Sequence, residues 1–359
     1  MEFVPPGLIT GHYDMSGKTG TLHSYRDLKA LRPVRVDNFI RLLDGEENEA
    51  LLNAYLRQKL GLVPIVRSSP RFKPRPDFPS RVLLEMTSRC NLNCTMCPRQ
   101  NLTREKIDID SELFMRCIDE LDTYGIDGLW IYNIGESILH PDFPELLDYV
   151  SSKNNLGPIW HSSNGQDLNE HFSRMIIHSK ISFMNLSVNA ATPETYKKVS
   201  PDADWNTMLS NFGRFIEMKR ETGRRTPFAR LQIIDQEHAG SEIDDFIKQH
   251  HDNADIISVN TLEAFSKDID SNVEHAARRD RPDKKSCRRV NRQDFFIFSN
   301  GETTFCDTDY NGTFSMGNVS NTSIHEIWNS DFRKEIIRLN NNGQLNDVAL
   351  CSNCLDFDL

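Results

Sequence analysis

Three closely spaced cysteines constrain this chain more than any other feature. Cys90, Cys94 and Cys97 have the spacing C-x3-C-x2-C and directly follow an apolar run, Val82–Met86, that is typical of a buried strand. Clusters of the 4Fe–4S type are normally held by four cysteine thiolates, so three thiolates leave one iron open to an outside ligand. An open coordination position indicates chemistry, whereas a full shell indicates a structural role. Three thiols can also hold zinc, which the spacing does not exclude.

The composition excludes several classes of function. The 359 residues carry a formal net charge of −10, whereas general nucleic-acid binders need a basic surface. No stretch approaches ~18 uninterrupted apolar residues, so we expect no membrane span. The first residues, Met-Glu-Phe-Val-Pro-Pro, lack the basic and then apolar pattern of a secretory signal. We therefore expect a cytoplasmic protein whose eight cysteines favour metal ligation over disulfides.

We predict four parts along the chain. They are an N-terminal extension (1–79), an α/β core (80–260), a polar linker (261–286) and a cysteine-bearing domain (287–359). The extension is expected to be helical, because Glu49–Leu60 has the apolar spacing of an amphipathic helix. A proline-rich connector is expected between this helix and the core.

Apolar, strand-like runs alternate with helical patterns throughout the core. The expected strands are 82–87, 128–133, 159–163, 183–188, 229–234 and 256–259. The expected helices are 111–124, 143–153, 168–178, 205–220 and 243–251. Six βα steps predict a parallel sheet with helices outside it. Parallel barrels place their chemistry at the C-terminal ends of the strands, which is where the three cysteines fall.

The last part of the chain combines a hairpin, a capped helix and a second set of cysteines. Two short apolar runs, Phe295–Phe298 and Thr303–Phe305, flank an Asn-Gly pair that favours a type I′ turn. Ser323 and Glu326 have the spacing of a helix capping box. A complete shell for zinc or for a 4Fe–4S cluster is available from Cys287, Cys306, Cys351 and Cys354.

These features resemble the radical S-adenosylmethionine (radical SAM) superfamily. The cysteine motif is similar to the cluster loop of that family, and Asn133–Ser137 resembles its Gly-Gly-Glu-Pro element, although Ile134 and Ser137 depart from it. The resemblance implies a partial (β/α)6 barrel in which the open iron of a 4Fe–4S cluster binds S-adenosylmethionine. An electron from the cluster would then cleave this cofactor to a 5′-deoxyadenosyl radical, which abstracts a substrate hydrogen.

The resemblance also implies the residues that contact the cofactor. Met96 would lie beside the adenine, although a methionine there is also ordinary core packing. Gly135 and Glu136 would receive the methionine ammonium, since carbonyls and an acid suit a cation. Polar contacts to the ribose and the methionine carboxylate would come from Asn164, Ser187 and Asn189. The alternative for these three positions is a plain turn or an ordinary strand end.

The C-terminal cysteines resemble the SPASM extension of radical SAM proteins, or its shorter twitch form. Four cysteines imply a single auxiliary 4Fe–4S cluster, with zinc as the alternative. Such a cluster has no iron free for substrate, so it would exchange electrons and favour a net oxidation. The cysteine layout is similar to that of the twitch-type dehydrogenases of 2-deoxy-scyllo-inosamine. We therefore expect an oxidoreductase that acts on a small polar substrate, sugar-like or aminocyclitol-like.

Three further residues are candidates for taking the hydroxyl proton in such an oxidation, because each closely follows a predicted cluster ligand: Arg99, Asp307 and Asp309. Basic residues crowd around Cys287, and they form either a solvated linker or a docking patch. The partner of such a patch would be an acidic electron donor such as flavodoxin or ferredoxin.

Three alternatives stay open. A peptide-modifying maturase is one, and it would be favoured by a strand-rich N-terminal extension. A sugar epimerase is another, but it needs a hydrogen donor, and the spare thiol of Cys117 falls on the apolar stripe of a predicted helix. The third is a zinc-binding interaction protein without enzymatic activity.

Overall fold

The chain divides into two compact units in this computed structural model. The first comprises residues 1–71 and 163–262, and the second comprises residues 72–162 and 263–359. The residues that the structure describes are 11–14, 62–66, 75–224, 226–250, 253–262, 284–352 and 354. The helix predicted at Glu49–Leu60 and most of the predicted linker lie outside them. The predicted domain boundaries stay a prediction.

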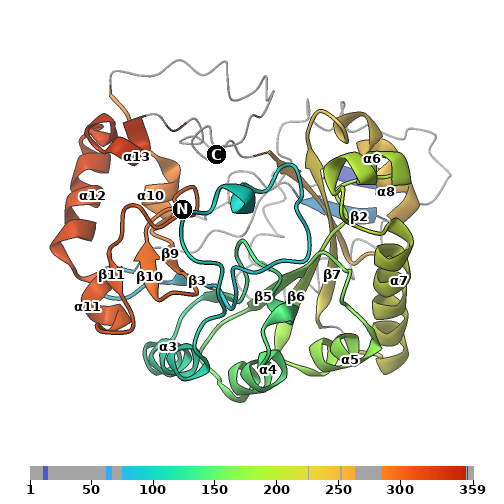
Figure 1. The fold of residues 1–359 in the computed structure, drawn as a ribbon, viewed down its shortest axis with the longest axis horizontal. Helices are drawn as coiled ribbons and strands as arrows, with labels where there is room; N and C mark the ends of the chain where they lie inside the picture. The colour runs from blue at the N-terminus through green and yellow to red at the C-terminus, as the bar shows by residue number, and fades with distance from the viewer. Residues whose placement is uncertain are drawn as a thin grey trace. The chain divides into compact units, whose positions relative to one another are not determined.

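The first unit is built on a sheet with the strand order β1-β2-β8-β7-β6. Its core strands run parallel and are β6 (Ile181–Ser187), β7 (Phe228–Asp235) and β8 (Ile256–Thr261). The described helices of this unit are α5 (Glu170–His178), α6 (Pro193–Val199), α7 (Trp205–Thr222) and α8 (Ile243–His250) (Figure 1). Near-continuous burial along β6 explains its apolar sequence, because parallel strands are covered on both faces.

Two short strands precede the core in this unit, and the sequence did not predict them. β1 (Gly11–Asp14) pairs antiparallel with β2 (Leu62–Val66), and β2 pairs parallel with β8. Pro64, which was expected to be the first proline of the extended connector, instead lies inside β2. The branched apolar residues around this proline favour a strand.

The second unit has a sheet with the strand order β5-β4-β3-β9-β10-β11. Its strands are β3 (Arg81–Leu84), β4 (Gly128–Trp130), β5 (Ile159–Ser163), β9 (Phe295–Ile297), β10 (Glu302–Thr304) and β11 (Gly317–Asn318). β9 pairs parallel with β3, so a strand of the C-terminal part lies beside the strand that leads to the cysteine motif. The predicted mixed α/β class with a largely parallel sheet is confirmed.

Six α-helices are described in the second unit. They are α3 (Ser111–Tyr124), α4 (Phe143–Ser152), α10 (Arg288–Arg292), α11 (Ile324–Trp328), α12 (Asp331–Asn341) and α13 (Ala349–Ser352). In Figure 1, α3 and α4 lie side by side, and α10 to α13 gather around the strands β9 to β11. Among the described helices of the chain, none is long and apolar enough to cross a membrane.

Local signals in the sequence account for the ends of several elements. Asp110 caps α3 by accepting a hydrogen bond from the Leu113 amide at 2.9 Å. The predicted capping box at Ser323 and Glu326 is confirmed at the start of α11. The predicted hairpin is also confirmed, and Gly301 in its turn has a φ of +81°, a conformation that favours glycine.

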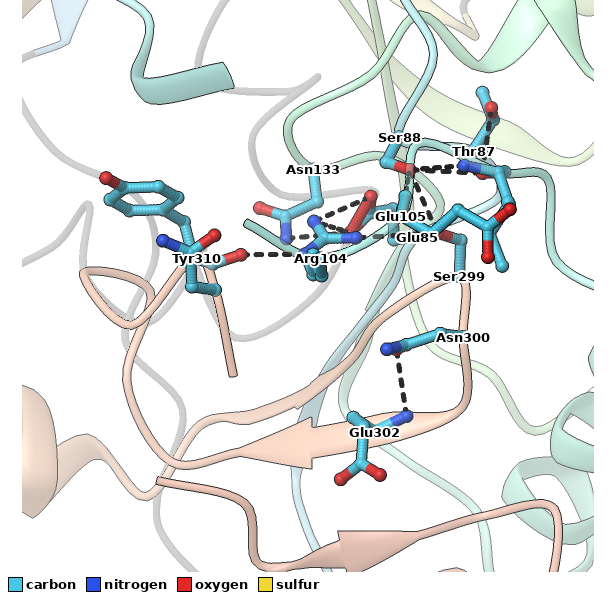
Figure 2. Close-up of polar contacts among 12 residues, drawn as sticks. Glu85, Thr87, Ser88, Arg104, Glu105, Asn133, Ser299, Asn300, Glu302 and Tyr310 are labelled. Atoms are coloured by element: carbon cyan, nitrogen blue, oxygen red, sulfur yellow. Dashed lines mark hydrogen bonds and ion pairs between the residues drawn. The ribbon is translucent and has the colours of Figure 1, made fainter. Parts of the chain in front are cut away.

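A buried ion pair lies in the segment after β3, and its arginine also contacts the C-terminal part of the second unit (Figure 2). Arg104 donates two hydrogen bonds to the Glu85 carboxylate, at 2.7 and 2.9 Å, and both side chains are at most 4 % exposed. The same guanidinium donates to the Tyr310 carbonyl at 2.8 Å and lies 4.4 Å from the Phe298 ring centroid. Arg104 thus binds the first core strand and the cysteine-bearing domain together.

Residues on both sides of Arg104 extend this network. The Asn133 amide donates to the Glu85 carboxylate at 3.4 Å, and the Ser299 hydroxyl donates to Ser88 at 3.2 Å. Burial raises the pKa of Glu85 to about 6, although Arg104 opposes this rise. The carboxylate is therefore costly to bury, and Arg104 compensates for that cost.

We expect Arg104→Met to lower the free energy of unfolding by about 3–5 kcal/mol, because it leaves the buried Glu85 carboxylate without its cation. A Glu85→Met/Arg104→Met double variant should lose less free energy of unfolding than Arg104→Met, since it leaves no unpaired charge buried. Anaerobic urea unfolding measures both values. The control is Arg338→Met, because Arg338 is 52 % exposed and its surface pair should contribute at most ~1 kcal/mol. Equal losses for Arg104→Met and Arg338→Met would contradict this account.

Candidate functional site

The cysteine motif lies on a loop whose two ends are bonded together. The Ser88 amide donates to the Ile107 carbonyl at 3.0 Å, and the Ile109 amide donates to the Met86 carbonyl at 2.9 Å. The Arg89 guanidinium also pairs with the Asp108 carboxylate at 2.6 Å. These bonds close the loop just beyond β3, so the three thiols are presented from a fixed base at the C-terminal end of this strand.

The three thiols of the loop lie half-buried and near one another. The Cys97 amide donates to the Cys94 carbonyl at 3.1 Å, which folds the second half of the motif into a turn. Burial raises the pKa of the Cys90 thiol to about 11, and the charges of Glu136 and Cys94 add to this rise. Metal binding would have to displace these thiol protons, as it does in thiolate sites generally.

The donor set of this loop consists of three thiols. Three cysteine thiolates can bind three irons of a 4Fe–4S cluster and leave the fourth iron open. The chemistry of Cys90, Cys94 and Cys97 therefore fits such a cluster, and their role as its ligands stays a prediction.

The segment after β4 packs directly on the base of this loop. A Cβ atom on Gly135 would lie 2.0 Å from the Thr87 carbonyl oxygen and 2.7 Å from that of Arg89. The Glu136 amide donates to the Arg89 carbonyl at 2.8 Å, and the Glu136 side chain is buried. The sequence-predicted cofactor residues Gly135 and Glu136 therefore lie next to the cysteine loop. Met96, also predicted to contact the cofactor, is buried within this loop.

The other predicted cofactor residues belong to the first unit. Asn164 lies in a turn after β5, where its side chain accepts a hydrogen bond from the Gln166 amide at 2.9 Å. Ser187 ends β6 and accepts a hydrogen bond from the Asn185 amide at 3.2 Å. Their roles in binding the cofactor stay a prediction.

Asn189 has two properties that are typical of a binding position. Its backbone φ is +59°, which is uncommon for any residue except glycine. Its side-chain oxygen is buried and has no hydrogen-bond partner among the residues that the structure describes. A buried acceptor of this kind is rare, and strained positions concentrate at ligand sites. The chemistry of this amide therefore fits a polar atom of S-adenosylmethionine.

The four C-terminal cysteines are all buried, at 7 or 8 % exposure. Burial is the main cause that raises the pKa of Cys351 to about 12, and the charges of Cys287 and Cys354 contribute to this rise. The pKa of Cys306 is raised by burial and also by Cys287. Since these effects require proximity, thiols from three separate segments approach one another. That these four cysteines hold one auxiliary cluster stays a prediction.

The three candidate proton acceptors are all engaged in other contacts. Arg99 is buried and donates to the Leu92 carbonyl at 2.7 Å, which braces the cysteine loop. Burial opposes ionisation of Asp307, but the guanidiniums of Arg289 and Arg292 hold the pKa of this carboxyl below its usual value. A carboxyl with a lowered pKa is a weak base.

Asp309 differs from Asp307, because burial raises the pKa of its carboxyl. It accepts hydrogen bonds from the Thr304 hydroxyl at 2.9 Å and from the Thr313 and Phe314 amides at 2.8 and 2.9 Å. These bonds hold the loop that follows Cys306. The catalytic roles of Arg99, Asp307 and Asp309 stay a prediction.

The sequence analysis missed Glu85 and misread part of the basic stretch around Cys287. Glu85 is a lone acid in an apolar strand-like run, which was a usable signal of a buried pair. Lys285 and Arg289 are 1 % and 3 % exposed, so neither a solvated linker nor a docking patch describes them. Arg278, Arg279 and Arg281 lie outside the described residues.

Comparison with protein families agrees with this organisation. The model of the Radical SAM superfamily matches residues 84–227, and the model of the SPASM iron–sulfur cluster-binding domain matches residues 287–355. The first match contains the cysteine loop and the segment after β4. The second contains all four C-terminal cysteines.

Two curated relatives cover part of the chain. The tungsten-containing aldehyde ferredoxin oxidoreductase cofactor-modifying protein of Pyrococcus furiosus is 29 % identical over 152 residues, 42 % of each protein. The mycofactocin maturase MftC of Mycobacterium ulcerans is 25 % identical over 184 residues, 51 % of this chain and 47 % of the relative. The chain thus spans less than half the length of these relatives.

Two solved structures share the fold. BtrN in complex with AdoMet and 2-DOIA has a TM-score of 0.51 and 16 % identity, over 77 % of this chain and 92 % of BtrN. Streptococcus suis SuiB bound to precursor peptide SuiA has a TM-score of 0.59 and 13 % identity, over 94 % of this chain and 76 % of SuiB. At these identities the likeness establishes the fold alone.

We expect Gly135→Ala to disrupt the cysteine loop, because the new methyl group would overlap the carbonyl oxygens of Thr87 and Arg89. Anaerobically purified protein should retain less iron and unfold at a lower urea concentration than the wild type. The control is Gly213→Ala in α7, where nothing lies within 4 Å of the added carbon, so stability should hold or rise by about 0.5–1 kcal/mol. Wild-type iron content in Gly135→Ala would refute the proposed close packing.

We expect two separable clusters in the purified protein. Replacing Cys90, Cys94 and Cys97 together with alanine should remove about four irons per chain, from about eight to about four. Iron, labile sulfide and zinc are measured per chain after anaerobic purification. Cys117→Ala is the matched control, because Cys117 is a buried packing residue of α3 and should leave the iron content unchanged. Stoichiometric zinc in place of iron would rule out the cluster assignment.

Proposed function

Because this chain is a radical SAM protein with a C-terminal SPASM domain, we propose that it catalyses the net two-electron oxidation of a small polar substrate. Its cofactors are S-adenosylmethionine, a 4Fe–4S cluster and an auxiliary iron–sulfur cluster. When bound, these groups supply a hydrogen-abstracting radical and an electron acceptor. Cys90, Cys94 and Cys97 would hold the first cluster. Glu136 and Asn189 would bind polar groups of S-adenosylmethionine.

One observation supports the oxidative assignment: the four cysteines of the SPASM domain are all buried, and Cys287 lies close enough to Cys306 and Cys351 to raise the pKa of both. Four thiolates would occupy every iron of a 4Fe–4S cluster and leave none for substrate. A closed cluster can still take up one electron. The substrate would therefore lose its second electron to the group held by Cys287, Cys306, Cys351 and Cys354.

The proposed oxidation balances as follows for a sugar-like or aminocyclitol-like carbinol. Bound S-adenosylmethionine would supply the radical that takes one hydrogen atom from the carbinol carbon and leaves as 5′-deoxyadenosine. The cluster held by Cys287, Cys306, Cys351 and Cys354 would accept the second electron, and the hydroxyl proton would go to a base, so that a carbonyl group would result. An external reductant supplies the electron for each S-adenosylmethionine that is cleaved. We propose a flavodoxin or a ferredoxin for that role.

A peptide substrate is the second candidate. The strands β1 and β2 add an antiparallel pair to the sheet of the first unit, although the extension was expected to be helical. A strand-rich extension is the feature expected of peptide-modifying relatives. SuiB, which shares the fold over 94 % of this chain, has been crystallised with its precursor peptide.

Turnover with a carbinol deuterated at the reacting carbon tests the oxidative proposal. We expect deuterium in 5′-deoxyadenosine, one 5′-deoxyadenosine per product, and a product two hydrogens lighter than the protonated substrate. Cys351→Ala should retain deuterium transfer but form at least ~10-fold less product, because the auxiliary cluster that accepts the second electron would lose a ligand. Cys117→Ala should behave as the wild type.

The mass of the product separates the alternatives in this experiment. An isomeric product of unchanged mass would refute the oxidation and favour an epimerase. Deuterium transfer only from a short peptide encoded beside this gene would favour the maturase.

A further inference from the structure

Polar side chains form a row across one face of the parallel strands of the first unit. The register of the strands places these residues on the same face: Asn185 and Ser187 of β6, Arg230 and Gln232 of β7, and Ser258 and Asn260 of β8. The other face is apolar, because Leu231, Ile233 and Ile257 are at most 2 % exposed. Parallel strands are usually apolar on both faces. This polar row therefore needs a reason other than packing.

The hydrogen bonds of the polar row run in one direction. A guanidinium can only donate, and that of Arg230 donates to the Ser258 hydroxyl at 2.7 Å. Ser258 passes its own hydrogen to the Asn260 side-chain oxygen, also at 2.7 Å. The Asn260 amide then donates to Oε1 of Gln232 at 2.8 Å, and the Asn185 amide reaches the same oxygen at 3.2 Å. Two donors on one oxygen fix the orientation of the Gln232 amide group.

Gln232 ends this chain of bonds with a donor that is still available. Because its oxygen accepts from both neighbours, its NH2 group lies on the other side of the amide. This group donates to no residue among those that the structure describes, and the side chain is only half-buried. An amide donor in a partly buried place is stabilised by an acceptor. The geometry therefore fits a ligand oxygen at Nε2 of Gln232.

Gln232 also lies beside residues that we propose to bind the cofactor. Ser187 is its register partner in β6. The amides of Val188 and Asn189 donate to the Gln232 carbonyl, at 3.2 and 3.0 Å. A substrate whose hydrogen is abstracted must lie next to the bound cofactor, because the reacting atoms have to be in contact. The amide donor of Gln232 is thus close to where a substrate would bind.

We propose that Gln232 determines specificity by donating a hydrogen bond to a hydroxyl oxygen of a polyhydroxylated substrate, such as an aminocyclitol. A row of amides and hydroxyls matches such a substrate, because each hydroxyl group both donates and accepts. This role rests on the proposed function, since the cofactor residues define where the substrate lies. Its test is equilibrium binding, which needs no turnover.

The probe is 2-deoxy-scyllo-inosamine, bound to the full holoenzyme with S-adenosylmethionine and without a reductant. Gln232→Glu is the key variant, because the carboxylate keeps an acceptor for Asn185 and Asn260 but replaces the NH2 donor. We expect the Kd of the aminocyclitol to rise about 10-fold, while the iron content and the Kd of S-adenosylmethionine stay at wild-type values. Gln249→Glu is the matched control, since Gln249 is exposed on α8 and should leave both constants unchanged.

Analogues that each lack one hydroxyl group separate recognition from a structural role. In the wild type, loss of the hydroxyl that Gln232 binds should weaken binding about 10-fold. In Gln232→Met, loss of the same hydroxyl should weaken binding less than 2-fold further, because the donor is already absent and the two changes are coupled. A residue that only supports the fold would weaken all analogues alike.

The other outcomes are also decisive. An unchanged Kd of the aminocyclitol in Gln232→Glu overturns the proposal, as does the same loss for every analogue in Gln232→Met. A raised Kd of S-adenosylmethionine or a loss of iron in both variants overturns it too, because Gln232 would then serve the cofactor or the fold. A wild type that binds none of these probes overturns the substrate class. Coupled binding without oxidation would refute the proposed function and leave the role of Gln232 intact.

Discussion

The ion pair of Glu85 and Arg104 is the interaction on which the second unit depends. Glu85 directly follows β3, the strand that leads to the cysteine loop, and Arg104 lies in that loop after the three cysteines. Because Arg104 also bonds the Tyr310 carbonyl and packs on Phe298, one guanidinium joins the cysteine loop to the SPASM domain. A buried pair of this kind contributes little net stability over apolar residues, but it tolerates few alternative arrangements. It thereby fixes where the loop begins and ends.

Burial governs the chemistry of both cysteine groups. Without metal, burial raises the thiol pKa values, to about 11 for Cys90 and about 12 for Cys351. Thiolates in such surroundings need a positive partner, which iron supplies directly.

Backbone geometry defines the other parts of the site. Gly135 lets the segment after β4 touch the carbonyls of Thr87 and Arg89, which no residue with a side chain could do. Asn189 holds a left-handed conformation, and its buried amide oxygen has no hydrogen-bond partner among the described residues. The conformation of Asn189 carries a local energetic cost, and such strained positions concentrate at ligand-binding sites.

The sequence alone determined the features that depend on local pattern. Alternating apolar runs predicted the core strands and the helices α3, α4, α5, α7 and α8. The Asn-Gly pair predicted the β9–β10 hairpin, and the cysteine spacing predicted two groups of thiols. Tertiary structure alone decided which distant residues meet. The pairing of β9 with β3, the bond from Arg104 to Glu85 and the burial of Lys285 join segments far apart in the chain. Such contacts leave no periodic trace in a single sequence, because the partner of a buried charge is selected by the fold and not by its neighbours along the chain.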